Sequence, residues 1–151
     1  MTECEPGWPE AHSHGTWLSL ANRLSEIRRL PVWIGELASR HSIPTEIEFA
    51  INVCLEEAVS NVIRHGYREG ERGEVIVHFT QPKANFFEFT VEDEARHFNP
   101  LDSPAPDTQG PPRVGGQGVH FLRHFAAQLE YSVKPRGNRL RMMFCGENSG
   151  T

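Results

Sequence analysis

Glu57 and Asn61 are four residues apart in a segment whose apolar residues recur at helical spacing. Residues at this separation lie one turn apart on the same side of a helix, so the carboxylate and the carboxamide project side by side at the edge of the apolar stripe. Such a pair can orient a nucleophile and hold a hard cation. Taken alone, the pair also fits a solvated helix flank.

Asp93 closes an apolar run that has the alternation of a strand, within the acidic sequence Glu92-Asp93-Glu94. A side chain at a strand end can point into a ligand crevice. A buried carboxylate there would accept a hydrogen bond from an exocyclic amine. A charged strand end without a further role is the alternative.

Gly115, Gly116 and Gly118 immediately precede a predicted helix that begins near Val119. Glycines let the backbone approach a ligand closely, and the N-terminus of a helix offers free N–H groups to phosphate. The run matches neither the Walker A pattern nor G-x-G-x-x-G after a strand, so by itself it is a weak signal.

His120 and His124 are also four residues apart and could bind a metal from one helix face. No third ligand with suitable spacing follows them, and Phe121 and Phe125 flank them. The surrounding sequence therefore disfavours a metal site at these histidines.

The elements that must position these residues follow from hydrophobic periodicity. Alternation predicts strands at 17–20, 74–80, 85–92, 131–133 and 140–144, and helical spacing predicts helices at 24–40, 46–65 and 119–128. Thr45 with Glu48 predicts a capping box at the start of the second helix, and Gly66 predicts its end. Pro31 marks either the start of the first helix or a kink in it. This order predicts an α+β two-layer sandwich, with the helices on one face of a mixed, mainly antiparallel sheet.

The chain has 151 residues, which suits one domain at 16–146 with a flexible leader at 1–15 and a tail at 147–151. Its net charge of -5 argues against a broad basic surface for nucleic acid or anionic lipid. No apolar stretch is long enough to cross a bilayer, and the start lacks a secretory pattern. Cys54 and Cys145 fall in apolar patterns and are expected to be buried, reduced thiols. We therefore expect a cytoplasmic protein.

Taken together, the three motifs resemble those of the GHKL ATPases, which have the Bergerat ATP-binding fold. Leu55–Gly66 (LEEAVSNVIRHG) resembles the N box, in the E-A-V-x-N…H-G form typical of the anti-sigma-factor serine kinases. Val91–Pro100 (VEDEARHFNP) resembles the D-x-G box with its trailing F-[DN]-P, and Gly115–Leu122 resembles the G-G-x-G-[LIV] box. Gly137–Leu140 is similar to the last hairpin of the family. The resemblance extends from about Trp17 to Phe144.

The resemblance implies a role for each matching residue. Glu57 would be the general base for a substrate serine, and Asn61 would hold the Mg²⁺ that bridges the ATP phosphates. Asp93 would recognise the adenine amino group. Ala95 stands where the D-x-G box has glycine, which adds a methyl group near the adenine pocket.

The remaining implied contacts are with the phosphates. Gly115, Gly116, Gly118 and Val119 would cradle them, and the proline- and glycine-rich segment 99–118 would form a flexible lid over ATP.

The function implied by the resemblance is an ATP- and Mg²⁺-dependent protein-serine kinase of a partner-switching system. Its substrate would be a STAS-domain antagonist, and a PP2C-type phosphatase would act in the same pathway. The resemblance leaves open whether a sigma factor is a second partner and whether the chain forms a homodimer. We expect no direct binding to nucleic acid or to a membrane. The alternative is a protein that binds ATP and its partner but transfers phosphate poorly or never. Ala95 is the main argument for that alternative, and Glu57 with Asn61 is the argument against it.

Overall fold

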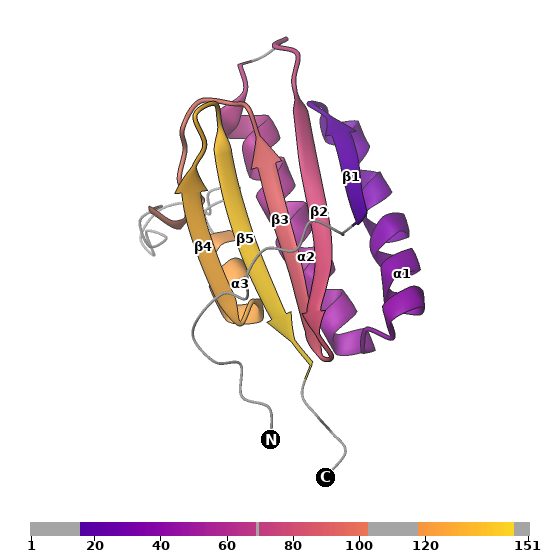
Figure 1. Cartoon of the computed structure of the whole chain (residues 1–151). Coiled ribbons are helices and arrows are strands. Elements are labelled where there is room, and N and C mark those ends of the chain that lie inside the picture. The colour runs from indigo at the N-terminus through magenta and orange to yellow at the C-terminus, as the bar shows by residue number, and fades with distance from the viewer. Residues whose placement is uncertain (1–15, 69, 103–117, 147–151) are drawn as a thin grey trace, which may run out of the picture.

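Five strands form one sheet in the computed structural model, which describes residues 16–68, 70–102 and 118–146 (Figure 1). The strands are β1 (Thr16–Ala21), β2 (Glu74–Lys83), β3 (Phe86–Asp93), β4 (Gln128–Val133) and β5 (Asn138–Cys145). Their order in the sheet is β1-β2-β3-β5-β4, and each neighbouring pair is antiparallel. The predicted α+β fold is confirmed, with a sheet that is antiparallel throughout its described strands.

Three helices cover one face of this sheet and make the second layer (Figure 1). They are α1 (Arg29–His41), α2 (Thr45–Asn61) and α3 (Gly118–Phe125). The short turns are η1 (Leu24–Arg28), η2 (Val62–Gly66) and η3 (Pro100–Asp102). Alternate strand residues fill the space between the layers: Leu20, Val75, Val77, Phe79, Phe87, Phe89, Val91, Leu140, Met142 and Phe144. Each such side chain stabilises the fold by roughly 1.5 to 3 kcal/mol.

The helix starts differ from the sequence prediction. The predicted first helix is a 3₁₀ turn, η1, followed by α1, and Pro31 lies in the first turn of α1, where no N–H is needed. The predicted capping box at α2 is wrong. Pro44 is the N-cap, no side chain caps the helix, and the Glu48 N–H bonds to the Pro44 carbonyl at 2.9 Å.

Two connections are also shorter than predicted. The predicted turn at 81–84 is wrong because β2 continues through an irregularity to Lys83, and a two-residue turn with Asn85 at φ 69° follows. Likewise, α3 ends at Phe125 and β4 already begins at Gln128, where the sequence predicted helix.

The two predicted thiols have different environments. Cys54 is free and fully buried, and burial raises the pKa of its thiol to about 12. Cys145 is only partly buried and is disulfide-bonded, so the prediction of a buried thiol is wrong there.

No helix among the described residues is long and apolar enough to cross a membrane. The predicted leader and tail lie outside the described residues.

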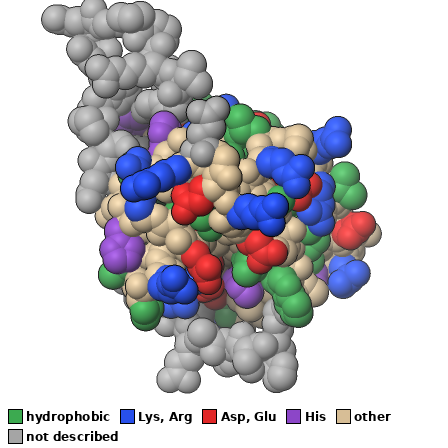
Figure 2. Space-filling view, turned by 90° about the horizontal axis from the view of Figure 1, so that it is seen from above, with side chains coloured by type: hydrophobic (Ala, Val, Ile, Leu, Met, Phe, Trp, Pro, Cys, Tyr) green, Lys and Arg blue, Asp and Glu red, His purple; other side chains and the backbone are tan. Residues whose placement is uncertain are grey.

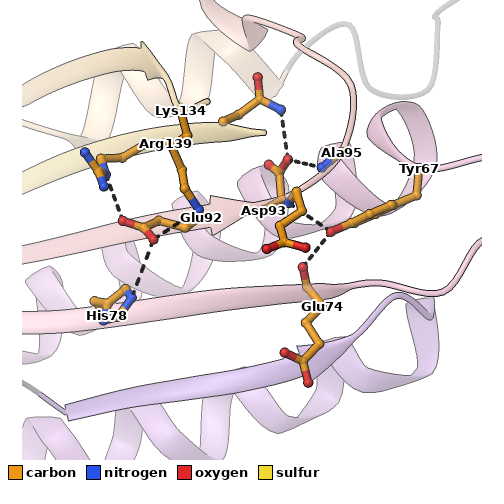
Figure 3. A network of polar contacts seen from close by, with 10 residues as sticks. Tyr67, Glu74, His78, Glu92, Asp93, Ala95, Lys134 and Arg139 are labelled. Atoms are coloured by element: carbon orange, nitrogen blue, oxygen red, sulfur yellow. Dashed lines mark hydrogen bonds and ion pairs between the residues drawn. The ribbon is translucent and has the colours of Figure 1, made fainter. Parts of the chain in front are cut away.

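Charged side chains pair across the strands on the sheet face that the helices leave open. Arg141 bonds to Glu88 at 2.6 Å. Glu92 accepts from Arg139 at 2.8 Å and lies 3.5 Å from Lys134 (Figure 3). These cross-strand pairs neutralise most of the charge on this face.

Candidate active site

Asp93 is the last residue of β3 and is only 4% exposed. Strand alternation puts its side chain on the helix-facing side of the sheet, while Glu92 beside it turns to the other face (Figure 3). Asp93 Oδ1 accepts hydrogen bonds from the Ala95 N–H at 2.9 Å and from Asn138 Nδ2 at 2.8 Å. These two donors bind the same oxygen, so Oδ2 accepts from neither of them.

Burial raises the pKa of the Asp93 carboxyl, and the hydrogen bonds from Asn138 and Ala95 counteract part of that rise. Of the two neighbouring acids, Glu92 pairs with Arg139 on the other face of the sheet, and Glu94 is exposed. The Glu94 N–H donates to the Tyr67 hydroxyl at 3.0 Å, and the Tyr67 hydroxyl donates to the Glu74 carbonyl at 2.8 Å (Figure 3). Of the three acids in this run, Asp93 alone points into the site.

Asn138, the first residue of β5, is the site residue that sequence reasoning did not select. Its Nδ2 donates to Asp93 and to the Arg96 carbonyl at 2.9 Å, and its Oδ1 accepts from the Phe98 N–H at 2.9 Å and from the Tyr131 hydroxyl. These four bonds use the full donor and acceptor capacity that a carboxamide commonly has. A single buried side chain therefore fixes Asp93, the segment after β3 and strand β4 together.

Gly137 makes this contact between strand ends possible. Its φ is +104°, a conformation that favours glycine, and a Cβ there would lie 1.8 Å from the Asp93 carbonyl oxygen. The turn before β5 can thus press against the end of β3, where Asp93 pairs with Asn138.

Glu57 and Asn61 lie near the C-terminal end of α2. Asn61 is the last residue of the helix and is 9% exposed. Glu57, one turn earlier, is partly buried, and its Oε1 is buried without a hydrogen-bond partner among the described residues. Burial raises the pKa of the Glu57 carboxyl, and the neighbouring Asn61 side chain and the charge of Arg64 lower it to a smaller extent. The structure therefore brings the predicted pair together.

A π turn, η2, follows Asn61 directly, where the sequence predicted that the α-helix continues to His65. The Tyr67 N–H bonds back five residues to the Val62 carbonyl at 3.2 Å. Such turns recur at functional sites. A Cβ at Gly66 would lie 3.0 Å from the Ala95 Cβ, so this turn packs closely against the segment after β3.

A small cavity lies between these elements, with a volume of about 20 Å³. It is lined by Ala58, Asn61, Val62, Gly66, Val91, Asp93, Phe98, Pro100, Tyr131, Asn138 and Leu140. This volume holds about one water molecule. Phe98 and Pro100, which follow β3, form one wall of the cavity. Ala95 is not part of the lining.

The predicted glycine-rich turn is only partly described. Gly115 and Gly116 lie outside the described residues, and so does most of the predicted lid at 99–118. Gly118 and Val119 are the first two residues of α3. Arg123 of this helix donates to the Leu101 carbonyl at 2.8 Å, which links α3 to the turn that carries the cavity residue Pro100.

The histidines of α3 show no metal-binding arrangement. The ring of His124 packs edge-on against Phe125, with 4.8 Å between the ring centroids. Within the described parts of the chain, no three His, Cys, Asp or Glu side chains gather to hold a metal ion.

Comparisons with known proteins place this geometry in a family. The family described as histidine kinase-like ATPase domain matches residues 20–144. The serine/threonine-protein kinase BtrW of Bordetella bronchiseptica is 22% identical over 113 residues, which cover 73% of this chain and 79% of that protein.

A solved structure shows the same fold. The histidine kinase domain from the blue-light activated histidine kinase of Erythrobacter litoralis EL346 has a TM-score of 0.53 at 16% identity. The match covers 81% of this chain but only 60% of that one, less than two thirds of its length. Because the match at residues 20–144 extends over most of the chain and includes α2 and the whole cavity lining, the chain belongs to the histidine kinase-like ATPase domain family of the GHKL superfamily.

Proposed function

We propose that this chain is an ATP-dependent protein-serine kinase of a partner-switching system, with a STAS-domain antagonist as its substrate. The observation that carries the proposal is the partly buried Glu57 carboxylate, one turn before Asn61. Its Oε1 has no hydrogen-bond partner within the described part of the chain. A carboxylate with these properties suits a general base. The similarity to a serine/threonine-protein kinase supports the same reading.

The residues present fit ATP and Mg²⁺. Asp93 would accept from the adenine amino group through Oδ2, since the Ala95 N–H and Asn138 Nδ2 both bind Oδ1. The Asn61 carboxamide supplies a hard oxygen ligand of the kind Mg²⁺ takes alongside phosphates. When bound, ATP supplies the phosphoryl group and Mg²⁺ neutralises charge on the phosphates.

Glu57 would then act on the substrate. Its carboxylate accepts the proton of the serine hydroxyl while the serine oxygen bonds to the γ-phosphorus and the bond to the bridging oxygen breaks. A raised pKa favours this role because it makes the carboxylate a stronger base.

The test uses radiolabelled ATP, Mg²⁺ and a STAS-domain protein encoded beside this chain. Glu57→Gln keeps the shape of the side chain but removes the base, so phosphotransfer should fall by about 100-fold or more. Binding of ATP, measured by calorimetry, should stay unchanged. Glu56→Gln is the matched control, because Glu56 is exposed and, one residue before Glu57 in the helix, points in a different direction.

Wild-type protein that binds ATP but never labels the STAS protein would contradict the kinase proposal and leave the alternative, a switch protein that binds without transfer. The sequence argument for that alternative was Ala95. In the structure the Ala95 methyl packs toward Gly66 and does not line the cavity, so this argument loses weight.

The wider setting rests on the family resemblance. We propose a cytoplasmic location, a PP2C-type phosphatase in the same pathway, and a sigma factor and a second copy of the chain as further candidate partners. Pull-down of each candidate with the purified chain, with and without ATP, tests these partners separately from the kinase activity.

A further inference from the structure

Six exposed arginines gather at the end of the molecule where β3 ends and β5 begins. We name this surface the arginine face; its residues are Arg23, Arg64, Arg68, Arg72, Arg96 and Arg136. They lie after β1, along the connection from α2 to β2, after β3, and in the turn between β4 and β5. Figure 2 looks onto this end and shows Lys and Arg side chains spread across it, with fewer acidic ones between them.

These arginines differ from the basic residues of the sheet in what they contact. Lys134, Arg139 and Arg141 each lie within 4 Å of a carboxylate. Among the described residues, none of the six on the arginine face forms such an ion pair. No ion pair among the described residues therefore neutralises these six guanidinium groups, in a chain whose net charge is -5. Arg96 Nε donates to the His65 carbonyl at 3.1 Å, and the charge of Arg64 also acts on Glu57.

A hollow in the arginine face adjoins the candidate active site. It has a volume of about 590 Å³ and is lined by Gly66, Arg68, Gly70, Glu71 and Arg96. Gly66 also lines the cavity beside Asp93. A partner side chain that enters this hollow is thus brought next to the proposed nucleotide site.

We propose that the arginine face docks an acidic surface of the protein substrate, an inference that rests on the proposed kinase function. The planar guanidinium group matches carboxylates in two-bond contacts. Among the described residues, three exposed acids, Glu71, Glu74 and Glu94, are interspersed among the arginines. They would repel the uninterrupted negative charge of a nucleic acid backbone, whereas a folded protein can place its own charges around them.

The test measures fluorescence anisotropy of a labelled octaglutamate peptide, with an octalysine peptide and a short DNA duplex as comparison probes. Arg72→Glu/Arg136→Glu reverses two charges on the arginine face. Arg40→Glu/Lys83→Glu is the matched control, because both residues are exposed and lie at the opposite end, where His41 bonds to Gln81. Binding of ATP to each variant reports that the fold and the nucleotide site are intact.

At about 20 mM salt, octaglutamate should bind the wild type, and the arginine-face variant should bind it about tenfold more weakly. The control variant should stay within about twofold of the wild type, and the difference should nearly vanish at about 0.5 M salt because exposed charges are then screened. Octalysine should not bind.

Three results would overturn the proposal: no binding of octaglutamate, equal losses in the two double variants, or tighter binding of the DNA duplex than of octaglutamate. None of them depends on phosphotransfer. Failure of the kinase proposal in the Glu57→Gln assay is thus distinguishable from failure of the docking proposal.

Discussion

Glu57 holds a carboxylate where its charge is poorly solvated. Burial raises its pKa above the ordinary value of 4.5, and its Oε1 has no hydrogen-bond partner among the described residues. The folded state therefore prefers the protonated form, and ionisation of Glu57 at neutral pH opposes folding. Residues that carry out chemistry commonly reduce stability in this way.

The expected consequence is that Glu57→Gln unfolds at a higher urea concentration than the wild type at pH 7. The wild-type carboxyl contributes fully to stability below its unfolded pKa of about 4.5, and that contribution is lost as the pH rises through the raised folded pKa. The advantage of the variant should therefore shrink toward zero at pH 4. Urea unfolding at both pH values measures it, and a variant less stable than the wild type at pH 7 would contradict it.

At the residue scale, the sequence predicted those site residues whose neighbours are local. Glu57 and Asn61 meet because helical spacing alone places them one turn apart. Asn138 was not selected, because its contact with Asp93 depends on β5 pairing with β3, and the order of strands in a sheet is not encoded in any one segment.

At the scale of elements, the site depends on a meeting of three ends: the end of α2, the end of β3 and the start of β5. The α2 end contributes Asn61 and the π turn, the β3 end contributes Asp93, and the β5 start contributes Asn138. The contact between the two strands is set by Gly137, whose conformation lets the turn before β5 approach β3.

Gly137→Ala should destabilise the fold by about 3 kcal/mol or more, because a Cβ would collide with the Asp93 carbonyl in addition to the strain of a positive φ. Gly70→Ala is the control, since Gly70 also has a positive φ, +79°, but nothing lies within 4 Å of the added atom. It should cost only about 1 kcal/mol. Chemical denaturation measures both, and equal losses would show that strain alone matters at Gly137.

The sequence predicted the existence and the order of the described helices and strands well, because hydrophobic periodicity reflects which face of each element is buried. Their ends were predicted less well. The capping box at Thr45 was displaced by Pro44, and the π turn after Asn61 has no signature in the sequence that distinguishes it from continued α-helix. At the end of β2, the pairing with β3 extended the strand beyond the expected turn.

On the scale of the whole molecule, the segment beside the cavity is linked to α3. The cavity beside Asp93 holds about one water molecule, and its wall includes Phe98 and Pro100, which belong to the segment that leads toward α3. The Arg123 contact with Leu101 ties that segment to α3. A change in the cavity wall at Pro100 would therefore also act on the packing of α3.

At an Mg²⁺-ATP concentration 100 times the dissociation constant, the ligand should raise the free energy of unfolding of the wild type by about 2.7 kcal/mol. The Asp93→Asn variant should bind Mg²⁺-ATP at least about tenfold more weakly. In the variant, Ala95 and Asn138 would hold the amide oxygen, so the amide NH₂ would face the adenine amine, donor against donor. Thermal unfolding with ATP, and with GTP as control, measures the effect. Undiminished stabilisation of the variant by ATP would refute the adenine assignment.

Cys54 lies on α2 with its sulfur 3.7 Å from the Phe121 carbonyl of α3, and its thiol has a pKa of about 12. Only a thiolate reacts readily with alkylating reagents, so this side chain stays inert while α3 remains packed on α2. The rate at which iodoacetamide modifies Cys54 therefore reports how often the packing between α2 and α3 opens, without any substitution in the chain.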